Sequence, residues 1–501
     1  MTRGVCAATS SAPSEAAPAR SGAGGVAALF TVPSRGLLSI ACLVQFMVVL
    51  DVTIVSVALP STGAALDLDI AGQQWVVNAY TLTLGGFLLV GGRAGDVFGR
   101  RRTLCTGLAV FSAASLAGGL AEGGTMLIAA RAIQGLGAAI IAPAALSLIT
   151  TTFTDDRARA RALTWWSVTA ASGGAFGTAA GGLLTDLLSW RWVMFVNVPI
   201  GIGLLMAAFM HIPSAGGRSE RTALDLPGAV TVTAGVGFLV YAIVTTRERG
   251  WGSAGTLGLL ACALALIGAF VLIEQRSRQP MMPLATLRNR TLAGANLISW
   301  LLGGVIVSQV VLISLFLQQV NGESPLRAGM LLLPISAVAL PAAFLAGRLV
   351  RSVGSRMILI VGPLFGAAGL LWLGQLGEGD PYLALLVPGL VSTAGIACCF
   401  VPVTIAGTRG VAPRDQGLIS GLLQSFRQVG AAVCLAALVT VAASQSTALV
   451  GEGLGRAAAL AGGYDRAFLV AAGLSMMMSL TALLLLPSDR PVPRGRDFSP
   501  A

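Results

Sequence analysis

Two charged side chains lie inside apolar stretches, where a charge is costly. Asp51 lies in an apolar run near residues 37–60, and Arg131 lies in a similar run near residues 125–152. An ionised residue near the centre of a bilayer costs about 2.5–3.5 kcal/mol on insertion scales, so a buried acid needs a proton, a partner or water to neutralise it. Because desolvation favours the protonated carboxyl, Asp51 could exchange protons. The alternative is a carboxylate permanently paired with an Arg or capping a helix.

Arg131 cannot carry a proton itself, because a guanidinium does not deprotonate at physiological pH. The apolar runs that hold Asp51 and Arg131 are the first and the fourth along the chain. Helices one and four cross a membrane in opposite directions, so the two residues are expected at similar depth. We therefore assign proton coupling to Asp51, with Arg131 tuning a nearby carboxylate.

Composition identifies the elements that must position these residues. The chain has 501 residues, of which 55% are hydrophobic and 11% are charged, whereas a soluble domain carries about 25% charged residues. Fourteen apolar segments approach the roughly 20 residues that a membrane-spanning helix requires. We expect an all-α integral membrane protein with 14 transmembrane helices. The segments near 192–212, 329–350 and 382–408 are each read as one helix.

The net charge is +11, and all the cations are Arg, since the chain has no Lys. The arginines gather in the two tails and in alternate loops, which is the positive-inside pattern rather than a nucleic-acid-binding face. This bias predicts a multi-pass protein of the cell (plasma) membrane with both termini cytoplasmic. No removable signal peptide is expected.

A loop at residues 92–102 returns in weaker form at residues 347–356. The spacing exceeds the length of six helices by enough for two more, so we expect two pseudo-symmetric bundles around a central cavity, arranged as 6+2+6 helices. The inserted pair is expected to pack peripherally. The predicted divisions are a disordered cytoplasmic tail (1–35), an N-terminal six-helix bundle (36–213), an inserted helix pair (214–291), a C-terminal six-helix bundle (292–487) and a cytoplasmic tail (488–501). Two six-helix bundles are the plan of a secondary transporter with its site between them.

The first loop copy resembles the signature between helices two and three of the major facilitator superfamily. The resemblance implies a cytoplasmic gating loop that latches the two bundles, although Val97 stands where the family has a cation. The alternative is a turn that only sets topology. The loop residues concerned are Gly92, Asp96, Gly99, Arg100 and Arg101.

Other segments resemble the fourteen-helix drug:proton antiporter branch of that superfamily over residues 37–487. Arg131 resembles the helix-four arginine associated there with proton coupling. Residues 190–199, 318–329 and 417–430 are similar to further motifs of this branch. Thr178 replaces a Pro in the antiporter signature, whose small residues are expected to pack helix five closely: Gly173, Gly177, Gly181 and Gly182.

Polar and aromatic groups on otherwise apolar helices are candidate liners of an amphiphilic substrate cavity. Each could instead be satisfied by a neighbouring helix, and Arg427 could either pack or act as a counter-charge to substrate. The candidates are Gln45, Asn78, Gln134, Trp165, Asn296, Trp300, Gln309, Gln424 and Arg427.

The sequence thus predicts a proton-coupled exporter of hydrophobic or amphipathic drugs or antibiotics that works by alternating access. One alternative is an exporter of a single metabolite or self-made antibiotic, and a remote one is a polytopic membrane enzyme acting on lipid. We expect no enzymatic activity, no metal and no cofactor, with the proton gradient as energy source. The expected partners are a small amphipathic molecule, protons and the lipid bilayer, without nucleic acid, and the protein is expected to be a monomer.

Overall fold

The computed structural model describes residues 32–153, 155–212, 225–277, 289–377, 379–409, 411 and 416–487. Within these ranges the chain forms helices and no strand. The predicted tails, 1–35 and 488–501, lie outside the described residues except where the first tail runs into the first helix. The helices are α1 (Val32–Ala65), α2 (Ile70–Phe98), α3 (Arg100–Gly119), α4 (Gly124–Thr152), α5 (Asp156–Leu187), α6 (Arg191–Phe195), α7 (Asn197–His211), α8 (Leu226–Arg249), α9 (Ala254–Arg276), α10 (Arg290–Gln319), α11 (Pro325–Ala337), α12 (Ala339–Val353), α13 (Ser355–Leu373), α14 (Tyr382–Ala397), α15 (Phe400–Thr408), α16 (Gln416–Gly451) and α17 (Arg456–Leu485).

Twelve helical segments of the described chain are long and apolar enough to cross a membrane. This confirms the prediction of an all-helical, multi-pass membrane protein. Helices α3 and α5 are not among the twelve, so the predicted total of fourteen is not confirmed.

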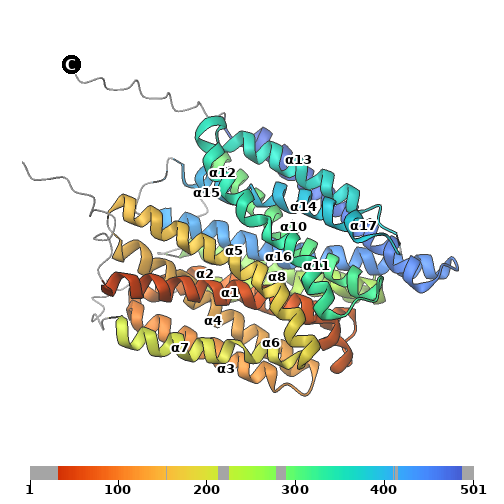
Figure 1. Cartoon of the computed structure of the whole chain (residues 1–501), viewed down its shortest axis with the longest axis horizontal. Helices are drawn as coiled ribbons and strands as arrows, with labels where there is room; N and C mark the ends of the chain where they lie inside the picture. The colour runs from red at the N-terminus through yellow and green to blue at the C-terminus, as the bar shows by residue number, and fades with distance from the viewer. Residues whose placement is uncertain are drawn as a thin grey trace, which may run out of the picture.

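The long helices lie side by side, as Figure 1 shows, with α1, α3, α4 and α7 on one side and α12, α13, α14 and α17 on the other. The start of α16 packs against the second part of α2, where Gly421 faces Leu89. Since α2 returns after α1, and α17 returns after α16, α1 begins and α17 ends at the same end of the bundle. We call this the tail end, and the opposite one the far end.

Both copies of the repeated loop adopt the same backbone conformation. Gly99 joins α2 to α3 with φ 85°, and Gly354 joins α12 to α13 with φ 84°. A positive φ of this size favours glycine, because a Cβ atom would be strained there. The two loops therefore occupy equivalent turns in the two parts of the chain, as the sequence repeat indicated.

Three of the segments read as single helices each contain a local break. The breaks follow Phe195, Ala337 and Ala397. In each case a proline stands four or five residues beyond the end of the first piece: Pro199, Pro341 and Pro402. Because proline has no N–H, it cannot donate to the carbonyl four residues earlier, and its ring crowds that carbonyl. Each break lies inside a single candidate membrane span.

Helix α8 lies across the junction between the early and late helices. Its buried residues Val236 and Val240 pack together with Leu82 of α2 and with Ala432 and Ala436 of α16. Helix α9 packs along α8 on the outside of this group. One helix of the predicted inserted pair therefore contacts both parts of the bundle.

Candidate functional site

A buried ion pair joins α1 and α4. One guanidinium nitrogen of Arg131 donates to Oδ2 of Asp51 at 2.6 Å. The Asp51 side chain is 0% exposed and that of Arg131 is 1% exposed. The structure thus brings together the two charged residues that the sequence placed at similar depth.

Two amide side chains complete the coordination of the Asp51 carboxylate. Gln134 of α4 and Asn197, the first residue of α7, each donate to Oδ1 at 2.8 Å. The same two amides donate to Oγ of Ser115 on α3, at 3.1 and 3.2 Å. Ser115 in turn donates to the Met194 carbonyl at 2.8 Å. The carboxylate therefore accepts three hydrogen bonds in all, which stabilise its ionised form.

Arg131 is held by α2 as well as by the acid. Its Nε donates to the Val76 carbonyl at 3.1 Å, and its guanidinium lies 4.3 Å from the centre of the Tyr80 ring. A second bond from the same nitrogen that meets Asp51 goes to Oε1 of Gln134, at 2.7 Å. If Asp51 were protonated, the positive charge of Arg131 would lose its counter-charge but would keep these contacts.

Small residues let the helices approach closely enough to form this network. A Cβ added at Gly137 of α4 would lie 2.7 Å from the backbone nitrogen of Phe111 on α3. A Cβ at Gly135 would collide with the Tyr80 carbonyl of α2. Backbones this close are typical of membrane helices that pack through glycine. The two glycines therefore set the distances over which Arg131 and Gln134 reach their partners.

The glycines of α5 face α1, and one of them faces the later helices. A Cβ at Gly173 would lie 2.9 Å from the Phe46 carbonyl, and one at Gly181 would lie 2.7 Å from the Ile54 carbonyl. A Cβ at Gly177 would lie 3.0 Å from the Leu50 carbonyl, one residue before Asp51. Gly182 instead lies against Pro325 at the start of α11.

The contacts described for the predicted gating loop stay among the early helices. Arg100 donates to Thr151 of α4 at 2.8 Å, and the Arg101 guanidinium lies 5.1 Å from the Phe209 ring of α7. A Cβ at Gly92 would meet only Pro143, at 3.8 Å. Asp96 lies in α2, but its side chain is outside the described residues. A latch between the two parts of the bundle therefore remains a prediction.

The predicted cavity liners have different surroundings in the structure, and their role in a substrate cavity stays a prediction. Asn78 is fully buried, and neither atom of its amide has a hydrogen-bond partner among the described residues. Gln309 donates to Ser392 and Thr393 at 2.7 and 2.9 Å. Asn296 donates to a carbonyl of its own helix. Trp165 is 60% exposed. Four other candidates are each half-buried: Gln45, Trp300, Gln424 and Arg427. The guanidinium of Arg427 lies over the Phe400 ring.

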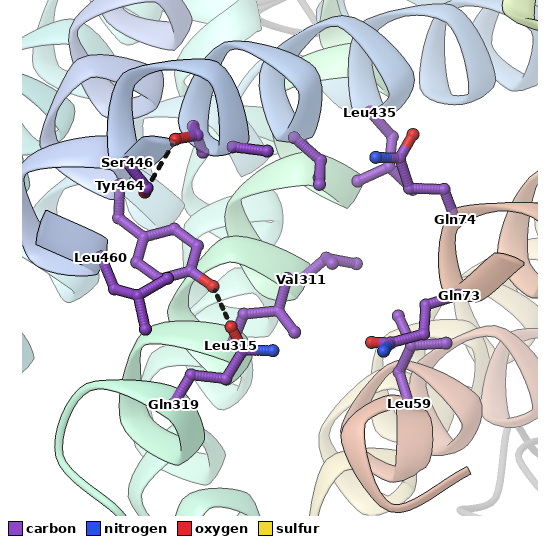
Figure 2. A pocket seen from close by; sticks show the side chains of 13 residues that line it. Leu59, Gln73, Gln74, Val311, Leu315, Gln319, Leu435, Ser446, Leu460 and Tyr464 are labelled. Atoms are coloured by element: carbon purple, nitrogen blue, oxygen red, sulfur yellow. Dashed lines mark hydrogen bonds between the residues drawn. The ribbon is translucent and has the colours of Figure 1, made fainter. Parts of the chain in front are cut away.

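A pocket that the sequence did not predict lies at the far end, between early and late helices. It has a cavity volume of about 40 Å³. Figure 2 shows side chains that converge on it from both parts of the bundle. Its polar lining consists of Gln73, Gln74, Gln319, Ser446 and Tyr464.

Profile comparison identifies the family. The Major Facilitator Superfamily profile matches residues 41–434. The chain belongs to this superfamily. Its members are transporters, and the buried Asp51–Arg131 pair therefore lies in the transmembrane bundle of a transport protein.

Curated relatives of this major facilitator protein cover nearly the whole chain. It is 40% identical to the cephamycin export protein CmcT of Amycolatopsis lactamdurans, covering 91% of this chain and 94% of the relative. It is 36% identical to the puromycin resistance protein pur8 of Streptomyces alboniger, covering 89% and 90%. Among solved structures, an auto-inhibited POT family peptide transporter matches with a TM-score of 0.64 at 16% identity, covering 92% of this chain and 99% of that one. The last similarity supports the fold alone.

Two residues of the hydrogen-bond network around Asp51 were not predicted from the sequence. Asn197 lies 146 residues from Asp51 along the chain. It belongs to the segment 190–199 that resembles the antiporter branch. The signal that could have identified it is an amide side chain on an otherwise apolar helix. Ser115 gave no comparable signal, because single serines are common in membrane helices. Within the described residues, no group of three or more His, Cys, Asp or Glu side chains could hold a metal ion.

Proposed function

We propose that this protein exports a hydrophobic or amphipathic drug or antibiotic in exchange for protons, by alternating access. The observation that carries the proposal is a titratable acid, fully buried beside an arginine inside the bundle of a transporter. Two relatives covering about nine tenths of the chain, named for cephamycin export and for puromycin resistance, support the export of antibiotics.

In this proposal Asp51 is the proton carrier and Arg131 is its electrostatic partner. Protonation removes the negative charge that Arg131 faces at 2.6 Å. The guanidinium then keeps its bonds to Gln134 and Val76. The loss of the ion pair weakens the contact of α1 with α4, and the two helices become free to move relative to each other. A proton taken up outside and released inside would drive substrate outward.

Contacts between the two bundles at the far end support a state that is closed on that side. Gln318 of α10 donates to the Val57 carbonyl of α1 at 3.1 Å. Gly182 of α5 packs on Pro325 of α11. Export requires these contacts to open. At the tail end, where the start of α16 already packs against α2 at Gly421 and Leu89, we propose that a loop latches the closed state: Gly92, Asp96, Gly99, Arg100 and Arg101.

We further propose the 6+2+6 arrangement of fourteen helices, with α3 and α5 as spans in addition to the twelve apolar ones. Helix α5 packs along α1 from Gly173 to Gly181, and α3 packs along α4 and α7. An even number of spans places both termini on one side, and the arginine bias assigns that side to the cytoplasm of the plasma membrane. We expect a monomer.

The name of the CmcT relative favours a second candidate, the export of one self-made antibiotic. The two candidates differ in substrate range. Expression in an efflux-deficient host exposed to a panel of unrelated drugs and dyes separates them. Broad resistance supports drug efflux, and protection against a single antibiotic class supports a dedicated exporter.

The experiment that tests the proposal uses everted membrane vesicles with a preformed pH gradient. Adding puromycin or another substrate found in the panel is expected to dissipate part of that gradient, and an ionophore that abolishes the gradient is expected to stop substrate uptake. Vesicles without the protein provide the control. Uptake that continues undiminished with the ionophore would contradict proton coupling.

A further inference from the structure

Arg427 is a cation of the C-terminal bundle that has no counter-charge in the structure. It lies in the candidate membrane span Leu418–Gly451, about 16 Å along α16 from the first residue of that helix. Its guanidinium lies 5.0 Å from the centre of the Phe400 ring. With the residues that the structure describes, it forms neither an ion pair nor a hydrogen bond. Arg131 of the N-terminal bundle is instead paired with Asp51.

The helices that contact Arg427 cannot supply an anion. Phe400 begins α15, and the Arg427 carbonyl lies where a Cβ at Gly303 of α10 would be placed. The sequences of α10, α15 and α16 contain no Asp or Glu. An ionised residue at membrane depth is costly, and such residues face a bundle interior or a water-filled space rather than lipid. An anion that binds beside Arg427 would therefore be stabilised.

Two amide side chains share the side of α16 that carries Arg427. Gln424 is followed by Arg427 after three residues and by Gln428 after four, and this spacing places them on one side of a helix. All three side chains are half-buried, and neither amide has a hydrogen-bond partner in the described part of the chain. None of their nitrogen atoms is fully enclosed, whereas the unpartnered amide nitrogen of Asn78 is. Their N–H groups are therefore open to a bound group.

The same side of α16 borders the N-terminal bundle. A Cβ added at Gly85 of α2 would lie 2.8 Å from the Cβ of Gln428 and 3.5 Å from the Ser425 carbonyl. Helix α2 also holds the partner of Asp51, because its Val76 carbonyl accepts from Arg131. A group bound by Arg427 and Gln428 therefore lies beside the contact between the two bundles.

A carboxylate is the group that these donors fit. A guanidinium presents its N–H groups as a planar fork that matches the two oxygens of a carboxylate, and bonds between charged partners are the stronger class. The two amides can donate to the same oxygens. The Phe400 ring beside the guanidinium suits the apolar remainder of an amphipathic solute. A carboxylate is therefore expected to bind here more tightly than a neutral group of the same size.

We propose that Gln424, Arg427 and Gln428 form a site for the carboxylate of an amphipathic solute that the protein exports. The inference rests on the proposed export function and adds the charge class of a substrate. The bound carboxylate supplies the counter-charge that Arg427 lacks. A movement that encloses this side of α16 then costs less free energy with the solute than without it, because an enclosed cation needs a partner.

The test uses benzylpenicillin, which has one carboxylate, and its methyl ester, which has the same apolar groups and no charge. Equilibrium binding of both radiolabelled compounds is measured on purified wild type, Arg427→Gln and Arg456→Gln. The last is the matched control, because it removes the same charge from an exposed residue at the start of α17. A further variant, Gln424→Leu, removes a neutral donor and keeps Arg427. The melting temperature of each protein checks its folding.

The wild type and Arg456→Gln are expected to bind the acid about tenfold more tightly than the ester. Arg427→Gln is expected to lose this preference, while its affinity for the ester stays at the wild-type value. Gln424→Leu is expected to bind the acid about fivefold more weakly than the wild type does, with the ester unaffected.

Equal affinities of the wild type for acid and ester, including no binding of either, contradict the site, and this comparison needs no variant. A preference for the acid that persists in folded Arg427→Gln also contradicts it. If Arg427→Gln does not fold, unchanged acid binding by Gln424→Leu contradicts the site. A wild type that binds the acid selectively without moving it into everted vesicles under a pH gradient contradicts the export function, whereas the binding comparison still decides the site.

Discussion

Replacing Asn197 with Ala is expected to shift the pH dependence of transport to higher pH. Asn197 donates one of the three hydrogen bonds that the Asp51 carboxylate accepts, and its length of 2.8 Å is that of a strong bond to a charged group. The bonds from Arg131 and Gln134 remain in the variant. The ionised carboxylate is therefore weakened without being left alone.

The magnitude follows from the bond that is lost. A hydrogen bond to a charged group contributes about 1.5–3 kcal/mol, and a difference of 1.36 kcal/mol between two protonation states corresponds to about one pH unit. The midpoint of transport against pH should thus rise by about 1 to 2 pH units. Its sign is upward because the neutral acid loses less than the carboxylate when a donor is removed. Tyr80 and Arg131 are the other ionisable groups in contact with this network.

The assay is the initial rate at which everted vesicles take up a substrate found in the drug panel, over a series of medium pH values at a constant pH difference. Asn296→Ala is the matched control, since Asn296 is an equally buried amide that bonds to its own helix on α10. It is expected to leave the midpoint unchanged. A midpoint that does not move in Asn197→Ala, or that moves downward, would refute the assignment of the titrating group to this network.

Three further predictions concern packing, charge and the closed far end. Gly177→Ala is expected to lower the free energy of unfolding by about 1–3 kcal/mol, because the added Cβ meets the Leu50 carbonyl and Thr53. The control Gly174→Ala, whose Cβ has its nearest contact at 3.9 Å, should leave the free energy of unfolding unchanged. Equal melting temperatures for the two variants would contradict this prediction. Arg131→Lys is expected to slow transport by about tenfold or more at equal expression, because one ammonium cannot reach Asp51, Gln134 and Val76 together. A wild-type transport rate in this variant would show that the geometry of the guanidinium is immaterial. Gln318→Leu removes the hydrogen bond from α10 to the Val57 carbonyl of α1. Combined with the reporter substitution Leu59→Cys, it is expected to increase labelling of that thiol by an impermeant reagent about fivefold. Unchanged labelling would show that this bond does not hold the far end closed.

Much of the architecture could be predicted because it depends on local or periodic features. The apolar segments, the arginine bias and the repeated loop are all visible in one sequence. The equal conformations of Gly99 and Gly354 follow from that repeat. The proximity of Asp51 and Arg131 follows from the opposite directions of helices one and four.

The features that could not be predicted depend on tertiary packing. The bond from Asn197 to Asp51 requires α7 to be placed against α1, and neither residue type nor spacing specifies that distance. The far-end pocket is formed by residues of five helices that come together only in the folded bundle, and no spacing in the sequence specifies that combination. The breaks at Phe195, Ala337 and Ala397 were accessible in principle, because a proline follows each one.

The central claim is that Asp51 exchanges the proton that drives export. The most direct measurement is substrate-induced proton flux in liposomes that contain purified wild type or Asp51→Asn at equal density. Asn keeps the size of the side chain and an oxygen for Arg131, but it cannot titrate. The account predicts that the substrate produces proton flux with the wild type and none with Asp51→Asn, which should still bind substrate. Full substrate-dependent proton flux in Asp51→Asn would contradict it.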